Sequence, residues 1–287
     1  MNADLTILSL GGGTQSCALA LMSAAGDLPK LDHVIFADTQ GELPETYEYL
    51  DYLQPIVEGA GIGWHVVSAG NLERAITGVE LAAGANPTPP LTLKHPNGKK
   101  GRINGYKCSY DFKRSRIERQ VKKLCGKPGA WKSAAIEQWI GFSLDEVGRM
   151  RDHPWMTNRW PLIELGMRRD DTIRWFSDNG HPTPPRSACW FCPNSGNERW
   201  SALKRDHPDL FDRAAQMDDA VRSARSFGTG TKGAFADGVE LFFHGSAVPL
   251  RDADIRTARQ RIAAAGQGEL FDVDVLAADC TAGVCFT

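Results

Sequence analysis

A glycine-rich turn near the N-terminus contains the residues best suited to bind an anion. The apolar run Leu5–Leu10 is typical of a buried strand, and Gly11, Gly12 and Gly13 separate it from the small polar residues Thr14-Gln15-Ser16, which open a helix. Glycines let the backbone bend sharply, so that successive N–H groups point at one ligand. The following helix adds its unpaired N–H groups and the positive end of its dipole. The pattern predicts a phosphate site, with a simple turn as the alternative, and it matches neither a Walker A loop nor GxGxxG.

Carboxylates and hydroxyls follow the next expected strand, His33–Asp38. This segment continues with Thr39, Glu42, Glu45 and Thr46. The carboxyl ends of parallel strands lie at one edge of a sheet, so we expect these groups beside the glycine turn. The alternative interpretation of Asp38 is a helix cap.

Positive charge surrounds a cysteine in the segment from Tyr106 to Ile117. Cys108 is followed by Lys113, Arg114 and Arg116. Fixed cations of this kind would hold an anionic nucleotide and would lower the pKa of a nearby thiol. A solvated basic helix is the alternative.

A second cysteine motif, Cys189-Trp190-Phe191-Cys192, has the spacing of a metal site or a redox pair. Zinc usually takes four ligands, and no second CxxC is present in the sequence. Thiolates also hold iron–sulfur clusters, and Cys108 would supply a third sulfur. The open alternatives are an iron–sulfur cluster, zinc, and no metal.

The elements that must position these residues alternate at first between strand and helix. Expected strands are Leu5–Leu10, His33–Asp38, Gly63–Val67 and Trp139–Phe142, and expected helices are Ser16–Ala25 and Pro44–Glu58. This order predicts an α/β fold with a doubly wound, mostly parallel sheet and a helical C-terminal portion. We expect a nucleotide-binding domain over 1–145, a helical cysteine-containing region over 146–225, and a hairpin with a flexible tail over 226–287. Within them, Ala83–Gly105 is expected to be a long loop, Trp200–Arg225 a helix and Val239–Phe243 a strand.

Composition sets the broad class of the protein. The 287 residues carry a net charge of -2, without an apolar run long enough to span a membrane, so a cytoplasmic protein is expected. The charge is uneven, because Lys94–Lys123 contains eleven Lys or Arg residues against Asp111 and Glu118. Such a stretch suits a nucleic-acid partner.

Taken together, the first two motifs resemble the pyrophosphatase (PP) loop superfamily, whose loop reads Ser-Gly-Gly-x-Asp-Ser. Asp38, Thr39, Pro44, Glu45 and Thr46 also resemble the Asp-Thr-Gly-x-x-Pro-Glu-Thr segment of its phosphoadenosine-phosphosulfate (PAPS) reductase branch. The resemblance covers roughly residues 5 to 225. It extends through Gly141-Phe142-Ser143 and Glu146-x-x-Arg149 to proteins of phages and to the sulfur-transfer subunit of DNA phosphorothioation systems. Two departures stand out: Gln15 replaces the aspartate of the loop, and Gly11 replaces its first serine.

The resemblance implies a set of site residues. Adenine-nucleotide binding, as ATP or PAPS with Mg²⁺, is expected at Ser9, Gly11, Gly12, Gly13, Thr14, Gln15, Ser16, Asp38, Thr39, Glu45, Gly141 and Arg149. Arg149 either contacts a phosphate or forms a structural ion pair with Glu146. A [4Fe–4S] cluster, or alternatively zinc, is expected on Cys108, Cys189 and Cys192.

Catalytic roles are expected for Cys108, Lys113, Cys280 and Cys285. The last two form a terminal pair, which resembles in position only the mobile nucleophilic cysteine of sulfonucleotide reductases. Partners implied are an adenine nucleotide, a nucleic acid along Lys94–Lys123, and a second copy of the chain in a homodimer.

Three functions remain open at this stage. The first is an ATP-dependent enzyme that adenylates a substrate and transfers sulfur to it. The second is a sulfonucleotide reductase that releases sulfite, which needs no ATP cleavage and tolerates Gln15. The third is a nucleotide-binding phage accessory protein without turnover.

Overall fold

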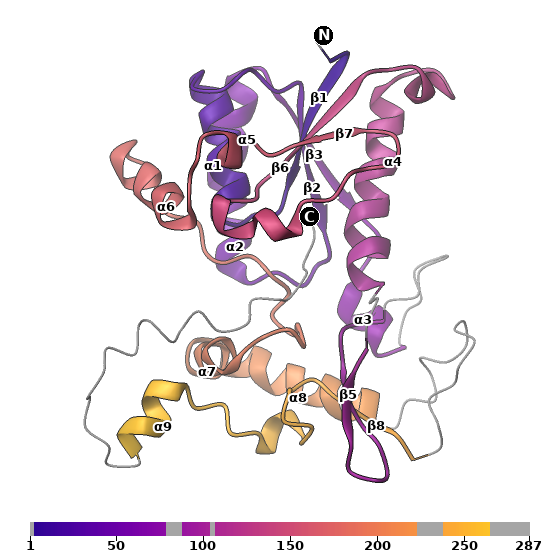
Figure 1. Ribbon diagram of the computed structural model, residues 1–287, viewed down its shortest axis with the longest axis vertical. Helices are drawn as coiled ribbons and strands as arrows, with labels where there is room; N and C mark the ends of the chain where they lie inside the picture. The colour runs from indigo at the N-terminus through magenta and orange to yellow at the C-terminus, as the bar shows by residue number, and fades with distance from the viewer. Residues whose placement is uncertain (1–2, 79–87, 104–106, 223–237, 265–287) are drawn as a thin grey trace. The chain divides into compact units, whose positions relative to one another are not determined.

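A computed structural model describes residues 3–78, 88–103, 107–222 and 238–264 of the chain (Figure 1). These residues form two compact units, each discontinuous in sequence. The first unit takes its described residues from Met1–Gly70 and Tyr110–Ala188, and the second from Asn71–Ser109 and Cys189–Phe286. This division follows spatial contact, and it differs from the consecutive ranges 1–145, 146–225 and 226–287 expected from the sequence.

The first unit is built on a five-stranded parallel sheet with the strand order β3-β2-β1-β6-β7. The strands are β1 (Leu5–Leu10), β2 (His33–Asp38), β3 (Gly63–Ser68), β6 (Ile136–Ile140) and β7 (Thr157–Arg159). The α/β fold with a mostly parallel sheet is confirmed. The central strands are buried on both faces, which explains why β1 reads as a continuous apolar run.

Helices cover both faces of this sheet. Leu8 and Leu10 of β1 pack with α1 (Thr14–Ala25) and α2 (Pro44–Gly59), whereas Leu5 and Ile7 pack toward α4 (Ser115–Leu124). Alternate side chains of a strand point to opposite faces, so one strand serves both cores. Three further helical segments, α5 (Pro161–Glu164), α6 (Arg169–Asp178) and the 3₁₀ turn η3 (Leu144–Arg149), follow β6 or β7.

Local sequence explains several helix ends. Gly26 adopts a left-handed conformation (φ 88°) that ends α1, as glycine commonly does beyond a helix C-terminus. Pro44 occupies the first turn of α2, where its missing N–H costs nothing. α4 is preceded by a π-helical turn, η1 (Tyr110–Arg114), and a 3₁₀ turn, η2 (Ala130–Lys132), comes before β6.

The second unit combines a small antiparallel sheet with helices. Its strands β4 (Thr92–Lys94), β5 (Lys100–Arg102) and β8 (Glu240–Phe242) are ordered β5-β4-β8. Its helices are α3 (Leu72–Ile76), α7 (Asn197–Asp206), α8 (Pro208–Arg222) and α9 (Ala258–Ala264), with a 3₁₀ turn η5 (Leu250–Asp252). No helix in the described ranges is long and apolar enough to cross a membrane.

Three sequence-based boundaries are corrected. The strand expected at Trp139–Phe142 begins at Ile136 and ends at Ile140, so that Gly141 and Phe142 lie in the following loop. The helix expected over Trp200–Arg225 is divided at His207, because Pro208 starts α8. The long loop expected at Ala83–Gly105 contains the β4–β5 hairpin. The strand expected at Val239–Phe243 is confirmed as β8.

Candidate functional site

The glycine turn between β1 and α1 has the backbone geometry of an anion nest. Gly12 has a left-handed φ of 76°, and α1 starts at Thr14 with no side chain capping it among the described residues. The Ser16 hydroxyl accepts the N–H of Gly11 at 3.0 Å and donates to the Gly13 carbonyl at 3.3 Å, which ties the two ends of the turn together. The N–H groups of the first turn of α1 therefore remain available for a ligand.

Gly141 fits this site because it has no side chain. It directly follows β6, the neighbour of β1, and a Cβ atom there would lie 2.7 Å from the backbone nitrogen of Ser16. Such an approach is shorter than real Cβ contacts and involves backbone that cannot rotate away. Gly141 thus lets the end of β6 lie against the start of α1.

Three buried hydroxyl groups occur on the elements that meet at this turn. Ser9 on β1 and Ser143 after β6 are fully buried, and so is Thr46 in the first turn of α2. Their hydroxyl oxygens have no hydrogen-bond partner among the described residues. The Thr46 side chain points toward the turn, since its methyl carbon would lie 3.1 Å from a Cβ on Gly12. A buried hydroxyl without a partner costs about 1–3 kcal/mol.

A buried ion pair lies beside the turn. The Glu42 carboxylate is nearly inaccessible and accepts a hydrogen bond from Lys113 Nζ at 3.2 Å. The Ser187 hydroxyl lies 3.0 Å from the other carboxylate oxygen of Glu42, and it also contacts the Gly11 carbonyl. Lys113 therefore lies at the site, as expected from the sequence, but its charge is matched by Glu42.

Sequence reasoning expected Glu42 beside the glycine turn but gave it no role, and it did not include Ser187 among the site residues. Glu42 occurs within the Asp38–Thr46 segment, and Ser187 comes just before the CxxC motif. The only available signal was their proximity to those motifs.

Gln15 forms part of a second polar group at the start of α1. Its side-chain amide donates to Glu146 Oε2 at 3.0 Å, and the Arg149 guanidinium donates to Glu146 Oε1. The Arg149 guanidinium also lies over the Phe142 ring, 4.4 Å from its centroid. The ion pair between Glu146 and Arg149, which was one of two alternatives for Arg149, is present.

Asp38 has a local structural role. Its carboxylate accepts hydrogen bonds from the Gln40 N–H at 2.7 Å and from the Tyr47 hydroxyl at 2.8 Å. Burial, and then the Asp38 contact, raise the pKa of Tyr47, so this hydroxyl stays protonated as a donor. Thr39 beside it is buried, whereas Glu45 is exposed.

The cysteines expected to bind metal all belong to the second unit. Cys189 and Cys192 are buried and form a tight turn in which the Cys192 N–H donates to the Cys189 carbonyl at 3.0 Å; Cys108 is half-buried. The described cysteines carry thiols rather than disulfides. Within the described part of the chain, no group of three or more His, Cys, Asp or Glu side chains is arranged to hold a metal ion. Cys280 and Cys285 lie outside the described residues.

The basic stretch Lys94–Lys123 is divided between the two units. Lys94, Lys100 and Arg102 belong to the β4–β5 hairpin of the second unit. The remainder from Tyr110 onward contributes η1 and α4 to the first unit. On α4, Lys122 Nζ lies 4.3 Å from the ring centroid of Trp131 and 4.9 Å from that of Trp155.

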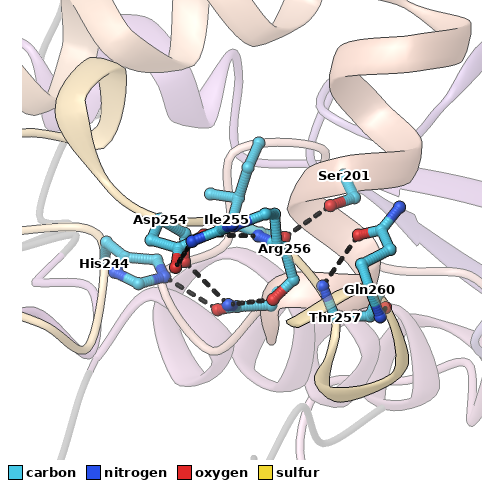
Figure 2. Close-up of polar contacts among 8 residues, drawn as sticks. Ser201, His244, Asp254, Ile255, Arg256, Thr257 and Gln260 are labelled. Carbon is cyan, nitrogen blue, oxygen red and sulfur yellow. Dashed lines mark hydrogen bonds and ion pairs between the residues drawn. The ribbon is translucent and has the colours of Figure 1, made fainter. Parts of the chain in front are cut away.

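The second unit has a surface depression of its own. It is lined by Ser201, Lys204, Arg205, Ile255, Arg256 and Gln260. Figure 2 shows its polar contacts, in which Ser201 donates to the Ile255 carbonyl and Arg256 pairs with Asp254 at 2.8 Å. None of the residues predicted from the sequence lines it.

The comparisons with known proteins find a likeness in fold but none in sequence. No protein-family profile matches the chain, and no curated protein matches it in sequence. Among solved structures, the fold is similar to that of phosphoadenylyl-sulfate (PAPS) reductase from Candida auris in a phosphate complex. The identity is 12% and the TM-score 0.38, and the match covers 62% of this chain and 74% of that chain.

Proposed function

We propose that this chain is an enzyme that binds an adenine nucleotide through its phosphates at Gly11–Ser16. The observation that carries the proposal is the turn itself: a left-handed Gly12, a helix start without a side-chain cap, and Ser16 closing the turn at 3.0 Å. The residues present thus fit a nucleotide phosphate chain.

The reaction proposed first is adenylation by ATP. An oxygen of the substrate forms a bond to the α-phosphorus, the bond from that phosphorus to the bridging oxygen breaks, and its electron pair leaves with pyrophosphate. Backbone N–H groups of the turn and the dipole of α1 stabilise the developing negative charge on the leaving group. Fixed N–H groups need no reorganisation as the charge moves, which suits them to this task.

Mg²⁺ would accompany ATP and screen its charge when bound. The carboxylates nearest the turn are engaged, Glu42 with Lys113 and Glu146 with Arg149. We therefore assign no Mg²⁺ ligand within this chain. The phosphate oxygens of the nucleotide and water molecules would provide most of the ligands of the ion.

Sulfur transfer completes the first proposal. In that step a hydrosulfide ion uses an electron pair to attack the adenylated carbon, the bond from that carbon to the AMP oxygen breaks, and AMP leaves with the electron pair of that bond. The [4Fe–4S] cluster on Cys108, Cys189 and Cys192 stays a prediction, and we route no step through it. A nucleic acid remains the proposed substrate class, with the basic stretch Lys94–Lys123 supplying phosphate contacts.

A specific observation favours sulfonucleotide reduction as a second candidate. Gln15 cannot offer a charged ligand to Mg²⁺, and its amide is occupied by Glu146. A reductase that binds PAPS or its unphosphorylated form cleaves no ATP. It therefore does not require the aspartate that the pyrophosphatase loop carries at the position of Gln15. In this candidate Cys280 and Cys285 would supply the thiols.

Two assays separate these candidates. The anaerobically purified full chain is first titrated with ATP, PAPS and AMP by calorimetry, and pyrophosphate release from ATP is then measured with and without nucleic acid. Release that requires nucleic acid supports adenylation. Sulfite formation from PAPS that is lost in the Cys280→Ser, Cys285→Ser double variant supports reduction. Absence of binding to all three nucleotides would overturn the proposal, and binding without either product would identify a non-catalytic nucleotide-binding protein.

A further inference from the structure

We infer that Ser187 is a positioning residue for the phosphate turn and that the buried Glu42–Lys113 pair is its anchor. Ser187 lies 176 residues from Gly11 in sequence, yet its hydroxyl contacts the carbonyl of that residue. The ligand-binding part of this inference rests on the proposed nucleotide site. The orientation of the peptide itself does not depend on it.

Ser187 packs directly over the turn. A Cβ on Gly12 would lie 3.6 Å from the Ser187 hydroxyl oxygen, and a Cβ on Gly13 would lie 3.6 Å from the Ser187 Cβ. A side chain on either glycine would thus be in van der Waals contact with Ser187, whose hydroxyl is hydrogen-bonded to the third glycine, Gly11.

This hydrogen bond determines which way a peptide group faces. The peptide joining Gly11 to Gly12 is planar and trans, so its carbonyl and its N–H point in opposite directions. With the Gly11 carbonyl held toward Ser187, the Gly12 N–H is directed away from Ser187. Without Ser187 this peptide can rotate, since glycine permits several backbone conformations.

Glu42 fixes Ser187 in turn. The Ser187 hydroxyl shares its single proton between two acceptors, the Gly11 carbonyl and Glu42 Oε2 at 3.0 Å, in a three-centre hydrogen bond. Lys113 holds the opposite oxygen of the same carboxylate at 3.2 Å. All three side chains are thereby fixed relative to the turn, although they come from three separate segments of the first unit.

Lys113 also makes the carboxylate compatible with an anion. A buried carboxylate beside a phosphate site would repel the ligand, and this repulsion is strong where solvent is excluded. The adjacent ammonium cancels that charge. Lys113 is therefore proposed to act on the nucleotide through Glu42, as a positioning residue.

The first experiment uses Ser187→Ala, with Ser177→Ala on the exposed end of α6 as the matched control. Chemical shifts of the Gly11 carbonyl carbon and the Gly12 amide are recorded without ligand, and inorganic pyrophosphate is then titrated. We expect both shifts to move in Ser187→Ala only, and the affinity for pyrophosphate to fall about fivefold to tenfold.

Unchanged shifts would overturn the inference, whether or not the affinity for pyrophosphate changes. If the shifts move in Ser187→Ala but the wild-type chain does not bind pyrophosphate, the proposed function fails and the positioning role stands. Ser187→Cys replaces the alanine variant if the latter does not fold.

A charge series tests the anchor. Lys113→Met leaves the Glu42 carboxylate buried and unmatched, so we expect pyrophosphate affinity to fall more than in Glu42→Gln. The double variant Glu42→Gln, Lys113→Met removes both charges and should recover affinity relative to Lys113→Met. A purely structural role predicts the opposite, with the double variant weaker than either single one. Equal affinities in Lys113→Met and the wild type would also overturn this part.

Discussion

At the start of α1, the side-chain amide of Gln15 donates a hydrogen bond to Glu146 at 3.0 Å. An aspartate at this position would place two carboxylates beside each other. The glutamine instead donates to one carboxylate oxygen of Glu146, while Arg149 donates to the other. A glutamine at this position therefore matches its surroundings better than a carboxylate would.

Gln15→Asp tests this match. Two like charges about 4 Å apart repel by about 1 to 4 kcal/mol, depending on their exposure to solvent, so the variant should be less stable than the wild type at pH 8. Each carboxyl then raises the pKa of the other, and the loss should shrink as the pH falls toward 5. Urea unfolding at both pH values measures the difference. The isosteric control is Gln15→Asn, which adds no charge; a loss independent of pH in the aspartate variant would contradict the explanation.

Gly141→Ala tests the close approach of β6 to α1. The added Cβ would meet the Ser16 nitrogen at 2.7 Å, and overpacking of this kind costs about 1–3 kcal/mol. We expect a lower melting temperature together with weaker nucleotide binding, since the shift falls on the turn itself. Gly148→Ala serves as the control, because a Cβ there meets nothing within 4 Å. Equal behaviour of the two variants in thermal unfolding and calorimetry would exclude the steric explanation.

At the level of elements, the second unit is organised around a buried carboxylate on α8. Asp218 is fully buried and accepts hydrogen bonds from the Phe243 N–H at 2.7 Å, the Leu250 N–H at 2.8 Å and Arg222 at 2.6 Å. One side chain thus joins the end of β8 and the start of η5 to α8. The Arg222 guanidinium, which also lies 4.5 Å from the Phe242 ring centroid, compensates the charge.

Replacing Asp218 by alanine should destabilise the second unit strongly. The change leaves two buried N–H groups without their acceptor and leaves Arg222 with Asp219 as its remaining carboxylate partner. Breaking a buried ion pair costs about 3–5 kcal/mol. Denaturant unfolding provides the measurement. Asp219→Ala is the neighbouring control, since this carboxylate is half exposed and its ion pairs contribute about 0–1 kcal/mol. A loss no larger than that of the control would show that other contacts hold these elements.

The elements of the first unit were predictable to the extent that local sequence specifies them. β1, β2, α1 and α2 carry continuous apolar runs, a C-terminal Gly26 or a first-turn Pro44, and these act within a few residues. The end of β6 was placed two residues late, because Phe142 is apolar and buried although it lies in a loop. Burial without strand pairing cannot be distinguished from a strand by composition.

The polar contacts of the site were less accessible to sequence reasoning. Glu42 and Ser187 are 145 residues apart, and Glu42 and Lys113 are 71 apart. No periodicity connects such positions, since only the folded sheet brings them together. The turn could be found from its glycines, and Glu42 and Lys113 from their own segments, whereas the contacts that join these two residues to Ser187 could not.

At the scale of the whole molecule, both units contain histidines that the fold keeps neutral. Burial is the main cause that lowers the pKa of His33, His65 and His153 in the first unit and of His244 in the second, below the ordinary value of 6.5. The unfolded chain binds protons at these positions once the pH falls below about 6.5, whereas the folded chain binds them at a lower pH.

This difference predicts how stability varies with pH. The contribution of these histidines to the free energy of unfolding is complete above pH 6.5. It declines as the pH falls through 6.5 toward their lowered pKa values in the folded state, because protons then favour the unfolded state. Asp254, whose pKa Arg256 lowers to about 2, titrates well below this window. Urea unfolding at pH 8, 7, 6 and 5 should therefore show a steady loss below pH 7, and His244→Gln should reduce its slope while retaining an amide that can contact Asn197. Stability that rises on acidification, or an unchanged slope in the variant, would show that these imidazoles are protonated in the folded protein.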